Sequence, residues 1–564
     1  MADPASEKPS RSPVPAAPGE ISMERRLLLA FLLMGLVLFL TPYFYPPASP
    51  PARPPVAPAK PAAAARPAAA PEARPAPGQV VADREEAFAI ETPLSRVVFS
   101  NRGAVVRSWV LKRYKDNDGK LLELVHPGAA KTGYPFAVVF KDPKGPGSIN
   151  DALFVGRPAR DGLGIDFEFA AQGIYARKSF RFRRDSYLVD VASEVVSHGR
   201  PQAHVLVWRG GFGDRTVPNY VARLRSIYYD ELAAKLVAHE VKEAKDAPLS
   251  VSGRFSFAGL EDAYFAAVAL APAGTPLELR TYHDMVPQPD GKESPCLGAG
   301  FGGPPTFALF VGPKDMDILR RINPKLEQLV DFGWFAFLAK PLFLSLNWIN
   351  DRWIHNYGWS IVVVTVIINF LLLPLKFSSL KSMKKMQALA PQIAAINEKY
   401  KGISLRDPRR AEQNQEIMEL YRKHGVNPMG GCFPLLLQIP FFIAFYKVLT
   451  VAIELRGASW LWVTDLSQPE HLPIRILPIA MIVSQFVMQK MTPTTTADPV
   501  QQRMLLLMPL VLGFMFYGVS SGLVLYWLTS NLVAIAQQWF FNKTIPAPVV
   551  APPPAPRRKK ASRR

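Results

Sequence analysis

The chain has little of what disulfide-rich, zinc-dependent or nucleotide-driven proteins need. Its 564 residues include only two cysteines and eight histidines. Cys296 lies among short alternating segments and Cys432 at the mouth of an apolar run, so we expect them on opposite sides of a membrane without a disulfide. No Walker A sequence occurs, and His239-Glu240 lacks the second histidine of a zincin site. The sequence therefore gives no support to a pump driven by bound nucleotide.

One glycine-rich run satisfies the dinucleotide-binding pattern in spacing only. Gly298-Ala-Gly300-Phe-Gly-Gly303 is followed by two prolines and a strand-like segment, so no helix N-terminus is available for a pyrophosphate. A sugar-active β-sandwich enzyme would need clustered histidine and glutamate side chains, and spacing alone does not bring the available ones together. We expect surface or core roles for these residues, which are His204, His239, His283 and Glu261.

Five long apolar segments dominate the C-terminal part, and each is about long enough to cross a hydrocarbon core of roughly 30 Å. They are 360–375, 433–455, 474–491, 504–519 and 523–541. A sixth apolar run at 27–45 follows Arg25 and Arg26, with no clear small-x-small cleavage site behind it. We predict a retained membrane anchor there, with a cleaved signal peptide as the alternative.

Polar side chains interrupt these segments at similar depths. At about 1.5 Å per residue, Asn369 lies roughly 10 Å inside Lys376, which marks the end of its segment. Several helices that present polar groups at one level predict a hydrated interior surface. Hydrogen bonds that hold a helix bundle together are the alternative. The polar residues at this level are Asn369, Gln438, Gln485, Thr529, Ser530 and Asn531.

The net charge of +20 is unevenly placed. Residues 376–423 carry 11 Lys or Arg and 5 Asp or Glu, and residues 543–564 carry 7 and none. By the positive-inside rule both stretches lie in the cytoplasm, whereas 456–473, with one Arg and two acids, lies outside. Crossings between these marks predict six spans with both termini in the cytoplasm.

The predicted fold is a membrane α-helical bundle of six transmembrane helices, five of them forming a core, plus a large all-β sandwich outside the membrane. The sandwich follows from short alternating runs between turn residues, and a Pro/Ala-rich stretch before it predicts an extended spacer. A Trp- and Phe-rich segment after it suits a helix lying in the outer interface. The predicted parts are 1–26 (cytoplasmic), 27–45 (anchor), 46–80 (linker), 81–318 (sandwich), 319–356 (interfacial helix), 357–543 (core) and 544–564 (basic tail).

A basic insert within the core, 376–428, predicts a cytoplasmic helical hairpin. Apolar residues recur at spacings of three and four in 378–400 and, in part, in 407–423. Two such amphipathic helices joined by a short turn pack against each other. The basic face can contact anionic lipid, RNA or a partner protein, or remain a solvated surface.

Three motifs of the core carry a family resemblance. They are Asn427-Pro-Met-Gly-Gly-Cys-Phe-Pro-Leu-Leu-Leu-Gln-Ile-Pro440, Gln489-Lys-Met-Thr-Pro-Thr-Thr495 with Asp498-Pro499, and Ser521-Gly-Leu-Val-Leu-Tyr-Trp527 to Ser530-Asn531. In this order they resemble the YidC/Oxa/Alb family of membrane protein insertases over about 331–543. More weakly, Arg107-Ser-Trp-Val-Leu-Lys112, Tyr264-Phe265 and Val311-Gly-Pro-Lys314 resemble the periplasmic domain of its Gram-negative branch.

The resemblance implies a bacterial inner-membrane insertase and folding chaperone that acts on nascent membrane proteins, alone or with the Sec translocon, without cofactor or metal. It implies a substrate groove lined by Thr365, Asn369, Gln438, Gln485, Tyr526, Trp527, Ser530 and Asn531, with simple packing left open for Tyr526 and Trp527. It implies substrate capture by the hairpin residues Lys381, Lys384, Lys385, Arg409 and Arg410. It implies ribosome or anionic-lipid contact by Arg557, Arg558, Lys559, Lys560, Arg563 and Arg564.

One position departs from the family pattern, which places an arginine where this chain has Asn369. Asparagine keeps hydrogen bonds and water but brings no positive charge, so we expect the groove to work by polarity alone. A multi-pass solute transporter or channel is the main alternative function, although we find no repeat relating the five core segments. A membrane-anchored sugar-active enzyme is the third.

Overall fold

The computed structural model describes residues 78–142, 146, 148–217, 220–272, 274–287, 293–402, 407, 409–426, 433–491 and 499–544, with backbone only at 287, 410, 433–437 and 499–506. The predicted anchor 27–45, most of the linker, Cys432 and the tail from 545 onward lie outside these residues. The chain divides into two compact units, Met1–Glu72 and Ala73–Arg564, and every described residue belongs to the second.

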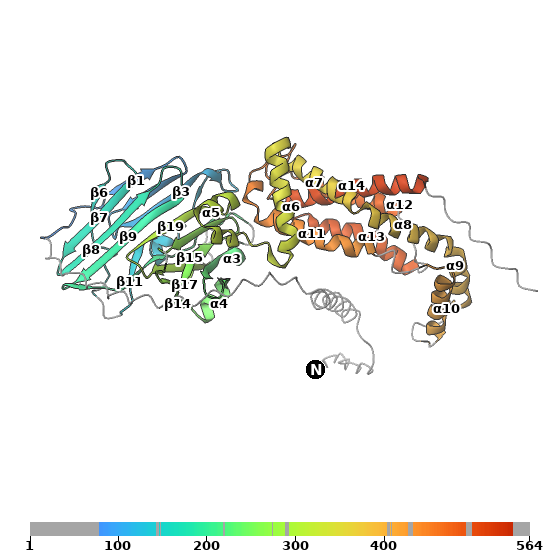
Figure 1. Ribbon diagram of the computed structural model, residues 1–564, viewed down its shortest axis with the longest axis horizontal. Coiled ribbons are helices and arrows are strands. Elements are labelled where there is room, and N and C mark those ends of the chain that lie inside the picture. The colour runs from blue at the N-terminus through green and yellow to red at the C-terminus, as the bar shows by residue number, and fades with distance from the viewer. Residues whose placement is uncertain are drawn as a thin grey trace, which may run out of the picture. The chain divides into compact units, whose positions relative to one another are not determined.

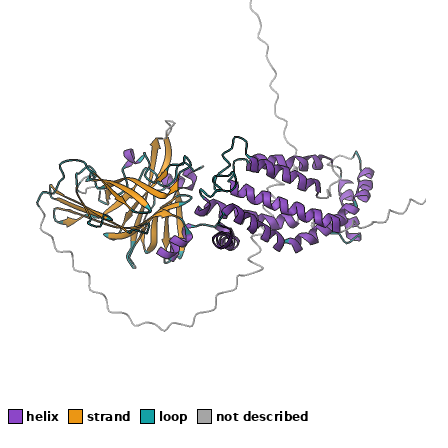
Figure 2. Cartoon of the chain, turned by 90° about the horizontal axis from the view of Figure 1, so that it is seen from above, coloured by secondary structure: helices purple, strands orange, loops and turns teal. Residues whose placement is uncertain are grey.

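The predicted all-β sandwich is confirmed and consists of antiparallel sheets (Figures 1 and 2). The largest sheet runs in the order β13 (Lys235–Glu240), β12 (Arg225–Asp230), β15 (Phe255–Glu261), β16 (Phe265–Leu270), β19 (Thr306–Pro313), β9 (Leu188–Ser197), β8 (Ile174–Phe182), β7 (Gly164–Ala171) and β6 (Val155–Pro158), with β10 (Arg200–Pro201) paired to β9. The second runs β14 (Ser250–Gly253), β17 (Leu277–Pro287), β18 (Glu293–Gly302), β11 (His204–Trp208) and β5 (Ala137–Phe140). The third runs β1 (Ala87–Glu91), β2 (Ser95–Ser100), β3 (Val105–Lys115) and β4 (Leu121–Glu123).

Aromatic side chains fill the space between the sheets. Trp109 of β3 and Trp208 of β11 lie with ring centroids 5.9 Å apart, and Phe136 meets Phe180 of β8 at 5.0 Å. All four side chains are buried. Because large aromatic side chains bury the most apolar area, these contacts account for much of the stability of the core.

The glycine-rich run itself lies in a strand, and the segment after it, predicted to be strand-like, is β19. Gly298 to Gly302 belong to β18, which pairs antiparallel with β17. Gly303 follows with a φ of +111°, and a Cβ there would lie 2.4 Å from the carbonyl oxygen of Pro276. The glycines therefore serve strand packing, and the segment offers no helix N-terminus.

Short helices accompany the sandwich, and longer ones form the rest of the described chain. The short ones are α2 (Ala129–Thr132), α3 (Tyr220–Arg223), α4 (Val241–Asp246), α5 (Met316–Ile322), η1 (Pro324–Leu329) and η2 (Gly333–Phe335). The remainder are α6 (Ala336–Ile349), η3 (Asn350–Ile354), α7 (Tyr357–Leu371), α8 (Leu373–Ala388), α9 (Ala390–Lys399), α10 (Arg409–Lys423), α11 (Phe433–Val451), η5 (Ile453–Leu455), α12 (Ile476–Met491), α13 (Pro499–Phe516) and α14 (Ser521–Thr544).

The five predicted apolar segments lie mainly in α7, α11, α12, α13 and α14, and the first two extend into α8 and η5. Within the described residues, no single helix is both long and apolar enough to cross a membrane. A bent pair, Gly333–Ile354 with Tyr357–Leu371, meets the criteria together, with an angle of 118° at the break. The second helix of the pair begins where the Asn356 side chain accepts a hydrogen bond from the amide of Trp359 at 3.2 Å.

The hairpin prediction was wrong in one respect. The stretch expected as one helix over 378–400 is two helices, α8 and α9, because Pro391 occupies the first turn of α9 and the chain breaks at Leu389. Helices α9 and α10 do pack together, through a small cluster that includes Ile393 and Tyr421. An ion pair of 3.0 Å between Lys399 and Glu416 joins the same two helices.

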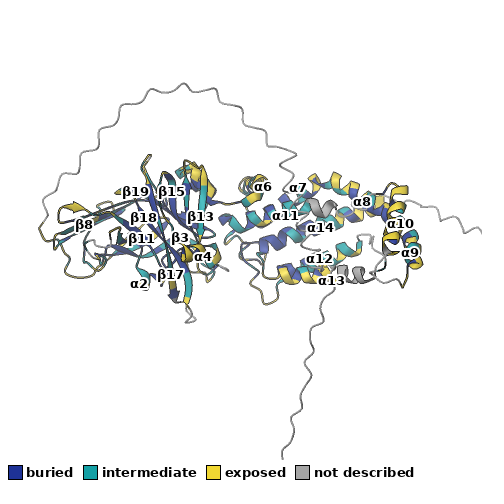
Figure 3. Cartoon of the chain, turned by 90° about the horizontal axis from the view of Figure 1, so that it is seen from below, coloured by how far each residue is buried: buried dark blue, intermediate teal, exposed yellow. Residues whose placement is uncertain are grey.

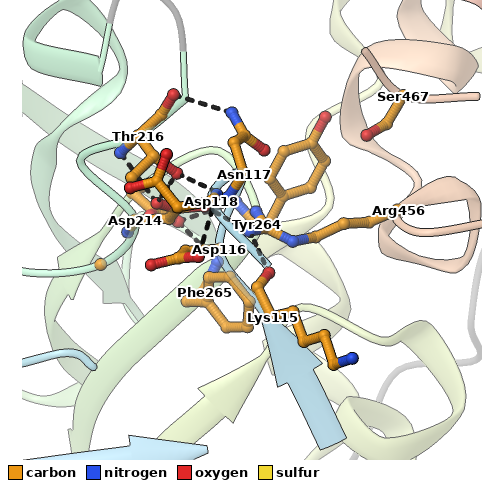
Figure 4. Close-up of polar contacts among 12 residues, drawn as sticks. Lys115, Asp116, Asn117, Asp118, Asp214, Thr216, Tyr264, Phe265, Arg456 and Ser467 are labelled. Carbon is orange, nitrogen blue, oxygen red and sulfur yellow. Dashed lines mark hydrogen bonds and ion pairs between the residues drawn. The ribbon is translucent and has the colours of Figure 1, made fainter. Parts of the chain in front are cut away.

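Arg456, from the loop after α11, is inserted into the sandwich (Figure 4). Its guanidinium pairs with the Asp214 carboxylate and donates to the carbonyl oxygen of Lys115 at 2.6 Å. The ring centroids of Tyr264 and Phe265 each lie 5.5 Å from its guanidinium carbon. The side chains of Arg456 and Asp214 are only 4% and 1% exposed, so a fully buried ion pair joins this loop to the sandwich.

Acid is expected to destabilise the sandwich through His126. This side chain is buried, with Nε2 2.8 Å from the carbonyl oxygen of Gly213, and burial lowers its pKa from 6.5 to about 4. Between these values the unfolded chain binds a proton that the folded chain does not, so stability falls as pH falls through this window, by up to about 3 kcal/mol. Thermal unfolding at a series of pH values measures the effect.

The matched variants for this pH series are His126→Gln and His198→Gln, the latter at an exposed turn. The first should flatten the dependence between pH 6.5 and 4, and the second should leave it unchanged. Equal slopes in wild type and His126→Gln would contradict the assignment.

Candidate functional site

A polar cluster lies in the interior of the helical core, between α7, α11 and α14. The side-chain nitrogen of Asn369 donates to the carbonyl oxygen of Thr365 at 2.9 Å and lies 3.4 Å from the Ser530 hydroxyl. Gln438 of α11 donates to the same hydroxyl at 3.2 Å, and Gln537 donates to the backbone oxygen of Asn369 at 3.2 Å. The structure therefore brings Thr365, Asn369, Gln438 and Ser530 together.

Three of the other predicted groove residues, Gln485, Trp527 and Asn531, lie apart from this cluster, between α12 and α14. Asn531 donates to the Ser484 hydroxyl at 3.0 Å, and the indole nitrogen of Trp527 donates to Gln485 at 3.4 Å. The Trp527 ring packs on Phe442 and Phe516, each with centroids 4.9 Å away. Gln485 thus contacts Trp527 rather than Asn369, and similar depth in the sequence did not place them in one cluster.

Tyr526 supports the packing interpretation that the sequence left open. Its ring stacks on Phe445 of α11 with centroids 4.3 Å apart and an interplanar angle of 18°. The side chain is 4% exposed and faces the interior of the bundle. In this arrangement Tyr526 positions α14 against α11.

The basic hairpin residues differ in their surroundings. Lys381 and Lys385 are exposed, as a contact surface requires. Lys384 lies under the end of α14, with Nζ 3.4 Å from the carbonyl oxygen of Phe541 and over its ring at 4.9 Å. Arg409 pairs with Asp407 at 2.7 Å. Lys384 therefore caps a helix C-terminus, while the side chain of Arg410 and residues 557–564 are not described.

The sequence reasoning missed Lys376, which it used only to mark the end of a segment. Its Nζ donates to the side-chain oxygen of Asn369 at 2.6 Å. The signal available was the spacing of seven residues, which returns to the same face of a helix after two turns. The expectation of a site without positive charge is therefore corrected: an ammonium group lies beside Asn369.

The outer faces of the core helices expose large apolar side chains, in contrast to the polar interior. Figure 3 shows which parts of these helices are exposed. Phe514 of α13 is 87% exposed and Leu371 of α7 is 73% exposed. Other large apolar side chains exposed on these helices are Ile367, Phe370, Val483, Val511, Trp539 and Phe540. Apolar faces outside and hydrogen-bonded polar groups inside are what a lipid environment selects.

At the other end of the core from the hairpin, the loop between α11 and α12 covers the start of α14. The carbonyl oxygen of Gln468 accepts from the amide and hydroxyl of Ser521, at 2.7 and 2.8 Å, and Gly522 donates to Leu466 at 2.8 Å. Trp460 lies against Gly358, where an added Cβ would be 2.2 Å from the ring. The loop therefore packs over this end of the helical core.

The residues considered for a sugar-active enzyme have separate partners. His204 contacts the Ser193 hydroxyl at 2.7 Å, His239 lies 3.8 Å from Glu243, and Glu261 pairs with Arg225 and Lys314. Across the described residues, no hydrogen bond or ion pair joins any two of His204, His239, His283 and Glu261.

Comparison with known proteins agrees with both halves of this description. The family described as 60Kd inner membrane protein matches residues 348–548, and the YidC periplasmic domain matches residues 87–345. A membrane protein insertase YidC of Geotalea daltonii is 35% identical over 479 residues, which cover 81% of this chain and 87% of that protein. The chain belongs to the YidC family of membrane protein insertases.

Other members of the YidC family match at similar levels. The insertase of Geobacter sulfurreducens is 34% identical over 476 residues, covering 81% of this chain and 86% of that protein. A solved structure of an active YidC insertase, with its first transmembrane domain resolved, is 19% identical and covers 91% of this chain and 99% of that one, with a TM-score of 0.36.

Proposed function

We propose that this chain inserts proteins into the bacterial inner membrane and assists their folding there. The observation that carries the proposal is the inverted polarity of the core: Asn369, Gln438 and Ser530 share hydrogen bonds inside a bundle whose outer faces are apolar. The YidC family membership supports it. No cofactor or covalent step is part of the proposal.

In the proposed mechanism, the polar interior receives the short hydrophilic segment of a substrate. Polar groups in hydrocarbon are costly unless partnered, and the amides of Asn369 and Gln438 can exchange their hydrogen bonds to Ser530 for bonds to the substrate. The apolar segment of the substrate then moves along the outer faces of the helices into lipid. The energy comes from burial of that apolar segment, so no nucleotide is needed.

We propose six spans with both termini in the cytoplasm, five of them being α7, α11, α12, α13 and α14. The contact between Arg456 and Asp214 supports this topology, because it requires the loop after α11 and the sandwich to share one side of the membrane. The 118° bend before α7, together with exposed Trp348 and Trp353, supports α6 lying in the outer interface.

Partners are proposed from the chemistry of the exposed residues and from the family resemblance. Exposed Lys381 and Lys385 suit anionic lipid headgroups or an incoming substrate, and the basic tail at 544–564 suits the ribosome or lipid. Action beside the Sec translocon is proposed from the family resemblance.

Asn369→Leu is expected to lower insertion of a single-span substrate about fivefold, the effect of losing about 1 kcal/mol of hydrogen bonding at the site. The measurement is the fraction of substrate protected from protease after insertion into proteoliposomes that contain the purified full chain. Ile367→Leu, on the apolar outer face of the same helix, is the control and should insert like wild type. Equal insertion by Asn369→Leu and wild type would remove the polar cluster from the mechanism.

A further inference from the structure

The feature that carries a further inference is the ammonium group beside Asn369. Helix α7 ends at Leu371 and α8 begins at Leu373, with Pro374 in its first turn. From the next turn, Lys376 extends back and donates to the side-chain oxygen of Asn369 at 2.6 Å. The side chain is half-buried, so the charge lies at the edge of the polar cluster rather than in bulk water.

The groups that this ammonium reaches are neutral. Asn369 is bonded to Ser530, and Ser530 to Gln438, so the cluster consists of amides and a hydroxyl. In the part of the chain that the structure describes, no carboxylate forms an ion pair with Lys376. An ammonium group has three donors and one of them is used by Asn369, which leaves two for an incoming acceptor.

Neighbouring basic residues are engaged differently. Lys384 contacts the last carbonyl oxygens of α14, Lys399 pairs with Glu416, and Arg409 pairs with Asp407. Lys376 instead combines a positive charge with a neutral partner at the boundary of the polar interior. A carboxylate that reached this position would gain a charge-assisted hydrogen bond in a partly dehydrated setting.

We propose that Lys376 determines substrate specificity by pairing with acidic residues in the hydrophilic segment that enters the core. Asn369 is its positioning residue, because its side-chain oxygen holds the ammonium at the cluster. The site thus keeps a positive charge although position 369 is an asparagine. This inference rests on the proposed insertase function and deepens it.

The test uses the purified full chain in vesicles of phosphatidylethanolamine and phosphatidylglycerol. The substrates are single-span proteins whose short leading segments differ only in two aspartates or two asparagines. Lys376→Gln is expected to lower insertion of the acidic substrate about fivefold, the effect of losing one partly screened ion pair, and to leave the neutral one within about twofold. Lys376→Arg should insert both like wild type.

Controls separate charge from folding. Lys490→Gln removes a positive charge from the exposed end of α12 and should change neither substrate. Lys376→Glu should disfavour the acidic segment and favour one that carries two lysines, a reversal that loss of folding cannot produce. In Lys376→Gln, adding Asn369→Arg should restore insertion of the acidic substrate.

Two results would overturn the inference: equal insertion of both substrates by Lys376→Gln and wild type, or an equal loss for both. If wild type inserts neither substrate above empty vesicles, the proposed function fails and the inference fails with it. If wild type inserts both substrates and Lys376→Gln changes insertion of the acidic and the neutral substrate to the same extent, the inference is refuted and the proposed function stands.

Discussion

Asp214→Ala is expected to release the loop after α11 from the sandwich and to destabilise the docked state by roughly 3–5 kcal/mol, because it leaves a buried guanidinium without its counter-ion. Arg456 would retain one hydrogen bond, to Lys115, and its contacts with the rings of Tyr264 and Phe265. The expected observations are a lower unfolding temperature of the full chain in detergent and faster protease cleavage in the loop.

Asp214 also caps a turn, since its carboxylate accepts from the amide of Thr216 at 2.8 Å, and this contribution must be separated. Asp230→Ala is the matched control: Asp230 caps a similar turn by accepting from Leu232 at 2.8 Å but has no buried cation. It should cost about 1 kcal/mol. The double variant Asp214→Ala with Arg456→Met should recover part of the loss, and a purely additive result would contradict a coupled pair.

Lys178→Met is expected to lower the free energy of unfolding by roughly 3 kcal/mol, because buried carbonyl groups lose their donor. The Lys178 ammonium is fully buried in the sandwich and donates to the carbonyl oxygens of Gly103, Phe136 and Ala104 at 2.6, 2.7 and 3.3 Å. Methionine has similar length and removes the donor with little change in packing.

Denaturant unfolding at pH 6 measures this loss. Burial lowers the pKa of Lys178 to about 7, so at pH 6 the amine is mostly protonated in the folded chain as well as in the unfolded one. Lys112→Met, at a surface ion pair with Glu91, is the control and should change stability by less than about 1 kcal/mol. Unchanged stability of Lys178→Met would show that the three carbonyl groups find other partners.

The sandwich and the core helices were predictable because each depends on local pattern. Alternating runs such as 188–197 became strands, and long apolar runs became helices. The predicted segment ends differed from the helix ends where a capping or breaking residue outweighs hydropathy. Helix α7 begins three residues before the apolar run because Asn356 caps it. The first helix of the hairpin is broken before Pro391. Both residues are recognisable capping or breaking signals that a hydropathy reading ignores.

The interior of the candidate site was only partly predictable. Asn369, Gln438 and Ser530 do share hydrogen bonds, since polar groups buried in one bundle must find one another. Gln485 instead contacts Trp527, because the partner of a polar side chain depends on how its helix is rotated about its axis. The depth of a residue in its segment does not specify that rotation. The pairing of Arg456 with Asp214 joins residues 242 positions apart, and no local pattern encodes such a contact.

The loop that covers the start of α14 has a consequence for the energetics of the cell. It forms hydrogen bonds with Ser521 and Gly522, and Trp460 fits closely on Gly358, so the loop packs over that end of the core. We expect water that enters from the hairpin end to stop at this loop rather than to form a continuous hydrogen-bonded chain that would conduct protons across the bilayer. A vesicle that contains this protein should then hold a proton gradient as long as an empty one does, so the proposed insertion would proceed without dissipating the gradient.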